Sequence, residues 1–177
     1  MSFRKTITIF SCVLTLACAI AIHSVISTVK LDTLNLLGLY FVLVSLIFGL
    51  VYLVLGFTKN LSKLYKASIL IGALNALMSI LLSLNESFDT TALITTSLAF
   101  ALYVVMLVAN NLGRKKSFII CIIIMSIRIT GIITNYLILK DFMNPQVLNI
   151  CGQFAIIVMV FAATSAKYVD KSSRNAE

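Results

Sequence analysis

Charge is scarce in this chain. Only 11% of its 177 residues are charged, and 60% are hydrophobic. A soluble globular domain keeps about a quarter of its residues charged, whereas this chain has several long runs without any charged residue, as membrane-spanning helices do. The composition therefore excludes a soluble domain and predicts a polytopic membrane protein.

Tryptophan is absent, and the chain has one histidine, one proline and four cysteines. The cysteines, Cys12, Cys18, Cys121 and Cys151, all fall inside apolar runs. That position favours a packing role over the disulfide framework of a small secreted domain. The sequence has no metal-ligand spacing, no nucleophile with a paired base and no glycine-rich phosphate loop. We therefore expect no enzyme activity, no bound metal and no cofactor.

Six charge-free runs are long enough to cross a bilayer core of roughly 30 Å as helices. They cover approximately residues 6–28, 34–57, 65–84, 90–110, 117–139 and 145–167. The only proline, Pro145, would begin the sixth helix, where its missing N–H is tolerated. Because every connection is short, we predict one all-α integral membrane domain over residues 1–177, a compact bundle of six transmembrane helices.

The net charge of +8 is distributed as a topology signal. Basic residues form four clusters that alternate with neutral or acidic loops: Arg4 and Lys5; Lys59, Lys63 and Lys66; Arg114, Lys115 and Lys116; Lys167, Lys171 and Arg174. Short loops rich in lysine and arginine stay in the cytoplasm, so we predict a plasma (inner) membrane protein with cytoplasmic N- and C-termini. The clusters also suit anionic lipid headgroups, and we expect no nucleic-acid partner.

Arg128 lies near the middle of the fifth predicted helix, too deep to reach either surface easily. A central arginine costs between about 2.5 and more than 10 kcal/mol, and such residues usually face a bundle interior and mark function. No aspartate or glutamate lies inside any predicted span. Three kinds of partner are open: polar side chains and carbonyls of the bundle, an anionic ligand or lipid phosphate, or a carboxylate on a partner's helix.

Other polar residues lie at comparable or shallower depths. Asn75 is part of a stripe on the third helix, with Ser68, Gly72, Ser79 and Ser83, and such stripes are also ordinary packing surfaces in lipid. Its depth is similar to that of Arg128, so we expect the third and fifth helices to face each other. Four further residues step outward from this level: Gln153, Asn135, Asn149 and His23. If these six side chains point inward together, they form a polar cleft open to the outer side, although a lone histidine near a helix end is as readily interfacial.

In outline, six short helices with both termini inside are similar to the substrate-binding S-components of energy-coupling-factor vitamin transporters. Ala17-x-x-x-Ala21 in the first helix resembles the small-residue docking motif of those subunits. The resemblance implies a solute-binding membrane subunit that docks on a partner. Because this spacing is common in membrane helices, it assigns no family.

These observations lead to two hypotheses. The first is a small transporter or solute-binding membrane subunit with a cleft for an anionic or zwitterionic compound, lined by Arg128, Asn75, Asn135, Gln153, Asn149 and His23. The second is a non-transporting accessory or assembly subunit, in which Arg128 pairs with an acidic residue of a partner membrane protein. The expected partners are the lipid bilayer, a small anion or lipid, and a membrane protein or further copies of the chain.

Overall fold

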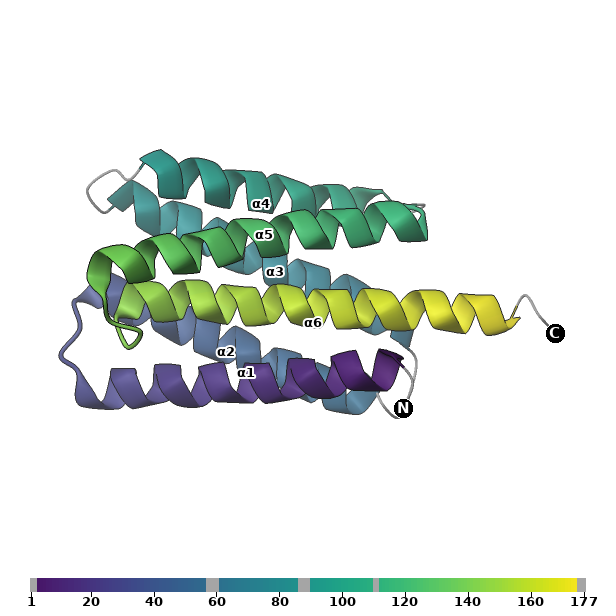
Figure 1. The fold of residues 1–177 in the computed structure, drawn as a ribbon, viewed down its shortest axis with the longest axis horizontal. Helices are drawn as coiled ribbons and strands as arrows, with labels where there is room; N and C mark the ends of the chain where they lie inside the picture. The colour runs from purple at the N-terminus through teal and green to yellow at the C-terminus, as the bar shows by residue number, and fades with distance from the viewer. Residues whose placement is uncertain (1–2, 57–60, 86–89, 110–111, 175–177) are drawn as a thin grey trace.

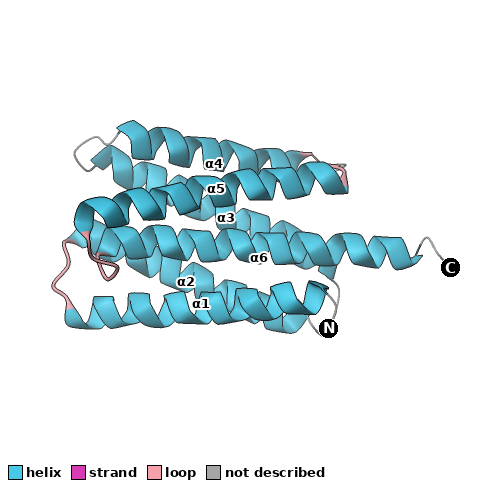
Figure 2. Cartoon of the chain, in the orientation of Figure 1, coloured by secondary structure: helices cyan, strands magenta, loops and turns pink. Residues whose placement is uncertain are grey.

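The computed structural model describes residues 3–56, 61–85, 90–109 and 112–174. These residues form helices joined by short connections, and no strand occurs among them (Figure 2). In chain order the helices are α1 (Phe3–Thr28), α2 (Thr33–Gly56), α3 (Leu61–Asn85), α4 (Thr90–Val108), α5 (Arg114–Leu139) and α6 (Pro145–Arg174). The all-helical fold class is confirmed. Lys59, from one of the basic clusters, lies outside the described residues.

Five of the described helices are long and apolar enough to cross a membrane, by length and composition. Their spans are Thr6–Thr28, Thr33–Val54, Tyr65–Leu82, Lys115–Leu139 and Pro145–Ser165. The remaining predicted span, the fourth (90–110), corresponds to α4, whose apolar part, Leu93–Val108, is shorter. Helices are the expected form of such runs because lipid offers backbone groups no other hydrogen-bond partners. The chain is a polytopic membrane protein.

Several helices extend further than predicted, at the ends that carry basic residues. α1 begins at Phe3 instead of residue 6, α3 at Leu61 instead of 65, and α5 at Arg114 instead of 117, whereas α6 continues to Arg174 instead of 167. The predicted limits follow the edges of the runs that lack charge. Charge limits the part of a helix that lies in hydrocarbon, but lysine and arginine are good helix formers, so the helices continue beyond it.

The start of α1 and the end of α6 lie at the same end of the bundle (Figure 1). We call this the terminal end and the other the opposite end. The connections between α1 and α2 and between α5 and α6 lie at the opposite end. Successive helices therefore alternate in direction, as short connections require.

α6 is the central helix. It packs against α1, α2, α3 and α5, and Figure 1 shows it running between α1 and α5. From Ala155 to Ser165 every side chain is buried except the half-buried Phe161. A helix that is buried all round belongs to the core of a bundle. By contrast, α4 lies at the edge, where it packs against α3 and α5 among the described helices.

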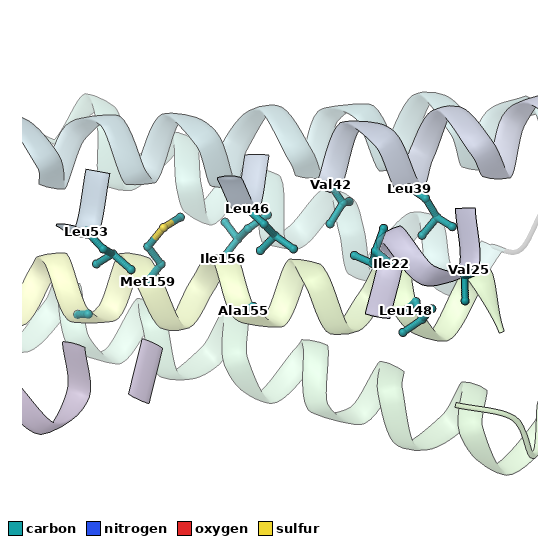
Figure 3. Close-up of a cluster of buried hydrophobic side chains, with 11 residues drawn as sticks. Ile22, Val25, Leu39, Val42, Leu46, Leu53, Leu148, Ala155, Ile156 and Met159 are labelled. Carbon is teal, nitrogen blue, oxygen red and sulfur yellow. The ribbon is translucent and has the colours of Figure 1, made fainter. Parts of the chain in front are cut away.

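One apolar cluster joins α1 and α2 to α6 (Figure 3). It contains Ile22, Val25, Leu39, Val42, Leu46, Leu53, Leu148, Ala155, Ile156, Met159 and Ala162. Glycines bring α2 and α6 close together, since a Cβ on Gly152 would overlap Val42 and a Cβ on Gly49 would overlap Met159. Close packing of this kind is what holds helices together in lipid.

A second cluster fills the space between α3, α4, α5 and α6, and we call it the α3–α6 cluster. It contains Tyr65, Ile69, Ala73, Ala76, Ala99, Tyr103, Met106, Cys121, Ile124, Ile157 and Val160. Gly72 makes room for one of its largest members, because a Cβ there would lie 2.6 Å from the ring of Tyr103. On each of the four helices, this cluster ends about halfway along, and a polar residue follows.

Candidate functional site

Arg128 is buried inside the bundle, with 6% of its side chain exposed. It follows Ile124 by one turn of α5, so it continues the face that packs into the α3–α6 cluster. Within the described part of the chain, its guanidinium forms no ion pair and no hydrogen bond. The sequence located this residue correctly as an intramembrane charge, and the structure places it in the protein interior.

Arg128 interacts electrostatically with Tyr103 of α4. Tyr103 is 3% exposed, and its ring lies against Gly72 of α3. A phenol oxygen can accept a hydrogen bond from a guanidinium, so Tyr103 is the group best placed to orient Arg128. A neutral phenol does not balance the positive charge.

Arg128 belongs to a layer of polar residues at one depth in the bundle. The members of the α3–α6 cluster nearest the opposite end on each helix are Ala76, Ala99, Ile124 and Ile157. One turn further toward the opposite end lie Ser79 on α3, Thr96 on α4, Arg128 on α5 and Gln153 on α6. We call these last four residues the polar layer.

Helix contacts support this common depth. The rings of Phe118 and Phe161 pack edge to face at 5.0 Å between α5 and α6. A Cβ on Gly131 would meet Ile150 at 3.6 Å, further along the same two helices. These antiparallel pairs place Arg128 opposite the part of α6 that contains Gln153.

Gln153 connects the polar layer to its neighbours. It is 6% exposed, and its Nε2 donates to Ser79 Oγ and to Asn149 Oδ1, at 2.7 Å each. Asn149 lies one turn nearer the opposite end of α6 and is half-buried. Gln153, Asn149 and Ser79 therefore form one hydrogen-bonded group between α3 and α6.

Asn75 lies one turn of α3 from Ser79, on the side of the terminal end, and is 2% exposed. Its Nδ2 donates to Ser45 Oγ of α2 at 2.6 Å and to the carbonyl of Ile71 at 3.1 Å. Within the stripe on α3, Ser68, Gly72 and Asn75 are therefore buried, Asn75 also forms a polar contact with α2, and the side chain of Ser83 lies outside the described part of the chain.

Two predicted site residues are placed differently. Asn135 is half-buried and donates to the carbonyl of Gly131 on its own helix at 2.9 Å, two turns from Arg128. His23 is exposed on the surface of α1. The structure therefore brings together Asn75, Gln153 and Asn149 near the depth of Arg128, leaves Asn135 at the rim, and does not place His23 with them.

The expectation that the third and fifth helices face each other is wrong. Among the described residues α3 packs against α2, α4 and α6, and α5 packs against α4 and α6. Tyr103 of α4 lies against Gly72 of α3 and also interacts electrostatically with Arg128 of α5.

Sequence reasoning missed two residues, Thr96 and Tyr103. Both are on α4, where we had identified no polar face. Thr96 is 6% exposed and Tyr103 is 3% exposed. A threonine and a tyrosine seven residues apart share a helix face, and this spacing was the available signal. Ser45 of α2 and Ser79, which belongs to the stripe on α3, both carry hydrogen bonds.

Comparison with models of protein families finds none that matches the chain, and no curated protein or solved structure matches it.

Proposed function

We propose that the protein binds an anionic or zwitterionic solute in its polar layer, as a small transporter or a solute-binding membrane subunit. The observation that carries this proposal is Arg128, a buried cation without an ion pair or hydrogen bond among the described residues. Burying an unpaired charge is costly, and in membrane proteins such charges mark substrate or ion pathways. An anion would supply the missing partner.

Burial favours a solute over a protein partner. A carboxylate on another protein's helix would have to reach Arg128 from the lipid side, but only 6% of this side chain is exposed. A small anion that enters between the helices needs no exposed arginine. The assembly hypothesis therefore becomes an outcome of the test below.

Each neighbour has a separate role in this proposal. Arg128 holds the anionic group through its planar pair of N–H donors. Tyr103 orients the guanidinium, and its own position depends on Gly72. Gln153, fixed by Ser79 and Asn149, lines the layer on the side of α6.

The test is a native mass spectrum of the full chain extracted from its own membrane in mild detergent. The wild type is compared with Arg128→Met and Arg128→Lys, and with Ile129→Met as a control, because Ile129 lies next to Arg128 and is 43% exposed. We expect a small bound anion in the wild type and the control and none in Arg128→Met. Lysine should weaken binding by about tenfold, since it cannot form the bidentate contact.

A co-purifying membrane protein that is lost in Arg128→Met but kept in Ile129→Met would contradict the solute proposal. It would establish Arg128 as an assembly contact. Retention of the same anion in wild type and Arg128→Met would also contradict the proposal, because the anion would then bind elsewhere.

We also propose that the terminal end of the bundle faces the cytoplasm and that the bundle lies in the plasma membrane. The support is the positive-inside rule, since the described residues of the four basic clusters lie toward the terminal end (Figure 1). Lys116 and Lys140 are exposed at opposite ends of α5. A membrane-impermeant maleimide should label Lys140→Cys in intact cells and Lys116→Cys only after permeabilisation. The reverse pattern would invert the topology.

A further inference from the structure

Two buried amide oxygens next to Arg128's layer receive no hydrogen bond from the described residues, namely Asn75 Oδ1 and Gln153 Oε1. The nitrogen of each amide is fully used, by Ser45 and Ile71 for Asn75 and by Ser79 and Asn149 for Gln153. The carbonyl of Ile71 can only accept, which fixes the amide of Asn75 with its nitrogen toward that carbonyl. The oxygen therefore has to point away from it.

Unpaired buried acceptors need an explanation, since each one costs about 1–3 kcal/mol. Asn75 and Gln153 are both more than nine-tenths buried, so bulk water does not hydrate these oxygens. The arrangement directs both amide nitrogens to partners and leaves both oxygens available.

The unpaired oxygens complement the unpaired donors of Arg128. Arg128 and Gln153 each lie one turn beyond Ile124 and Ile157, and these two isoleucines pack in the same cluster. The unpaired N–H donors of Arg128 on α5 thus lie in the same layer as the unpaired acceptor Gln153 Oε1 on α6. A ligand that carries one acceptor group and one donor group would satisfy both sides.

The net charge of the layer favours a hydroxyl over an ammonium group as the hydrogen-bond donor of the ligand. None of the membrane spans contains an aspartate or glutamate. A carboxylate bound to Arg128 makes the layer neutral, whereas an additional ammonium group would leave one buried positive charge with only neutral oxygens beside it. A hydroxyl group donates the same hydrogen bond without adding charge.

We propose that the ligand is a small hydroxylated carboxylate, whose carboxylate binds Arg128 and whose hydroxyl donates to Gln153 Oε1. Asn75 Oδ1 is the second acceptor, for a ligand with a further hydroxyl. This inference rests on the proposed function and narrows its solute class from anions and zwitterions to hydroxy acids.

The test compares three acids of equal length, propionate, lactate and alanine, for binding to the purified full chain in lipid nanodiscs by titration calorimetry. One neutral hydrogen bond is worth about 1 kcal/mol, so lactate should bind about fivefold more tightly than propionate. Alanine should bind no more tightly than propionate. Gln153→Met keeps the side-chain length and removes the oxygen, so it should reduce lactate binding to the level of propionate.

Gln153→Met is judged by the ratio of its lactate and propionate affinities, which should fall from about five to about one even if the substitution weakens the binding of both acids. Thr130→Val is the matched control variant, since Thr130 is exposed on α5, and it should change neither affinity. Equal affinities for lactate and propionate, tighter binding of alanine than of lactate, or an equal loss of lactate and propionate binding in Gln153→Met would each overturn the hydroxy-acid inference. Failure of the proposed function is different: none of the three acids would bind the wild type, or all would bind Arg128→Met unchanged.

Discussion

Replacing Arg128 with methionine should make the protein more stable while it abolishes anion binding. Methionine keeps the unbranched stem and removes a guanidinium that is 6% exposed and unpaired within the described residues. A central arginine costs about 2.5–3.5 kcal/mol on membrane-insertion scales, and the electrostatic interaction with Tyr103 that is lost is not a hydrogen bond in the structure, so it is worth at most about 1 kcal/mol. We therefore expect a net gain of about 2 kcal/mol in the free energy of unfolding.

The measurement is a titration with sodium dodecyl sulfate in mixed micelles at neutral pH, with helix loss followed by circular dichroism. Arg128→Lys keeps a buried charge and should not share the gain, whereas Ile129→Met replaces a lipid-facing side chain and should be neutral. A loss of more than about 1 kcal/mol in Arg128→Met, with Ile129→Met unchanged, would refute the reasoning. That result would mean that internal partners hold Arg128 and that its role is structural.

Three further changes probe the packing, one helix end and the site. Gly152→Ala should destabilise the bundle by about 1–3 kcal/mol, because its Cβ would overlap a valine of α2, whereas Gly131→Ala, with its nearest atom at 3.6 Å, should be neutral in the same detergent titration. The side-chain amide of Asn35 donates to Asp32 at 2.6 Å and lowers the pKa of Asp32 below its ordinary 3.8. The ionised Asp32 therefore stabilises the fold fully above pH 3.8, and this stabilisation should be lost as the pH falls through the lowered pKa of the folded protein. Asp32→Ala should remove this contribution from the pH dependence of the free energy of unfolding. Tyr103→Phe should keep the fold and weaken anion binding by about threefold, measured by calorimetry, because the guanidinium loses the oxygen that orients it.

The sequence predicted the helices well because lipid makes the pattern simple. Runs without charge had to become helices, and Pro145 marked the start of α6 to the residue. The limits at the terminal end were less accurate, since charge marks the edge of the hydrocarbon and not the end of a helix. α4 was predicted as a full span, and its apolar part is shorter than those of the other helices.

The partners of individual side chains could not be predicted in the same way. Asn75 and Arg128 lie at similar depths, and depth follows from counting residues along a run. Which helices touch depends on packing, and here Gly72 admits the ring of Tyr103 from α4, while α3 and α5 make no direct contact among the described residues. Membrane helices have little hydrophobic contrast between their faces, so periodicity gives weak information about which face turns inward. For this reason His23 was predicted to face inward, whereas it lies on an exposed face of α1.

The burial around the polar layer indicates from which end a solute would reach it. Toward the terminal end, the residues that follow on α5 and α6 are Ile124, Cys121, Ile157 and Val160, each with 0% of its side chain exposed. Toward the opposite end, Gly131 and Asn135 on α5 and Asn149 and Ile150 on α6 are all only half-buried. A solute entering from the terminal end would have to separate the whole α3–α6 cluster, whereas entry from the opposite end passes these half-buried and partly polar neighbours. A binding subunit needs only the second route, and a transporter must also open the first.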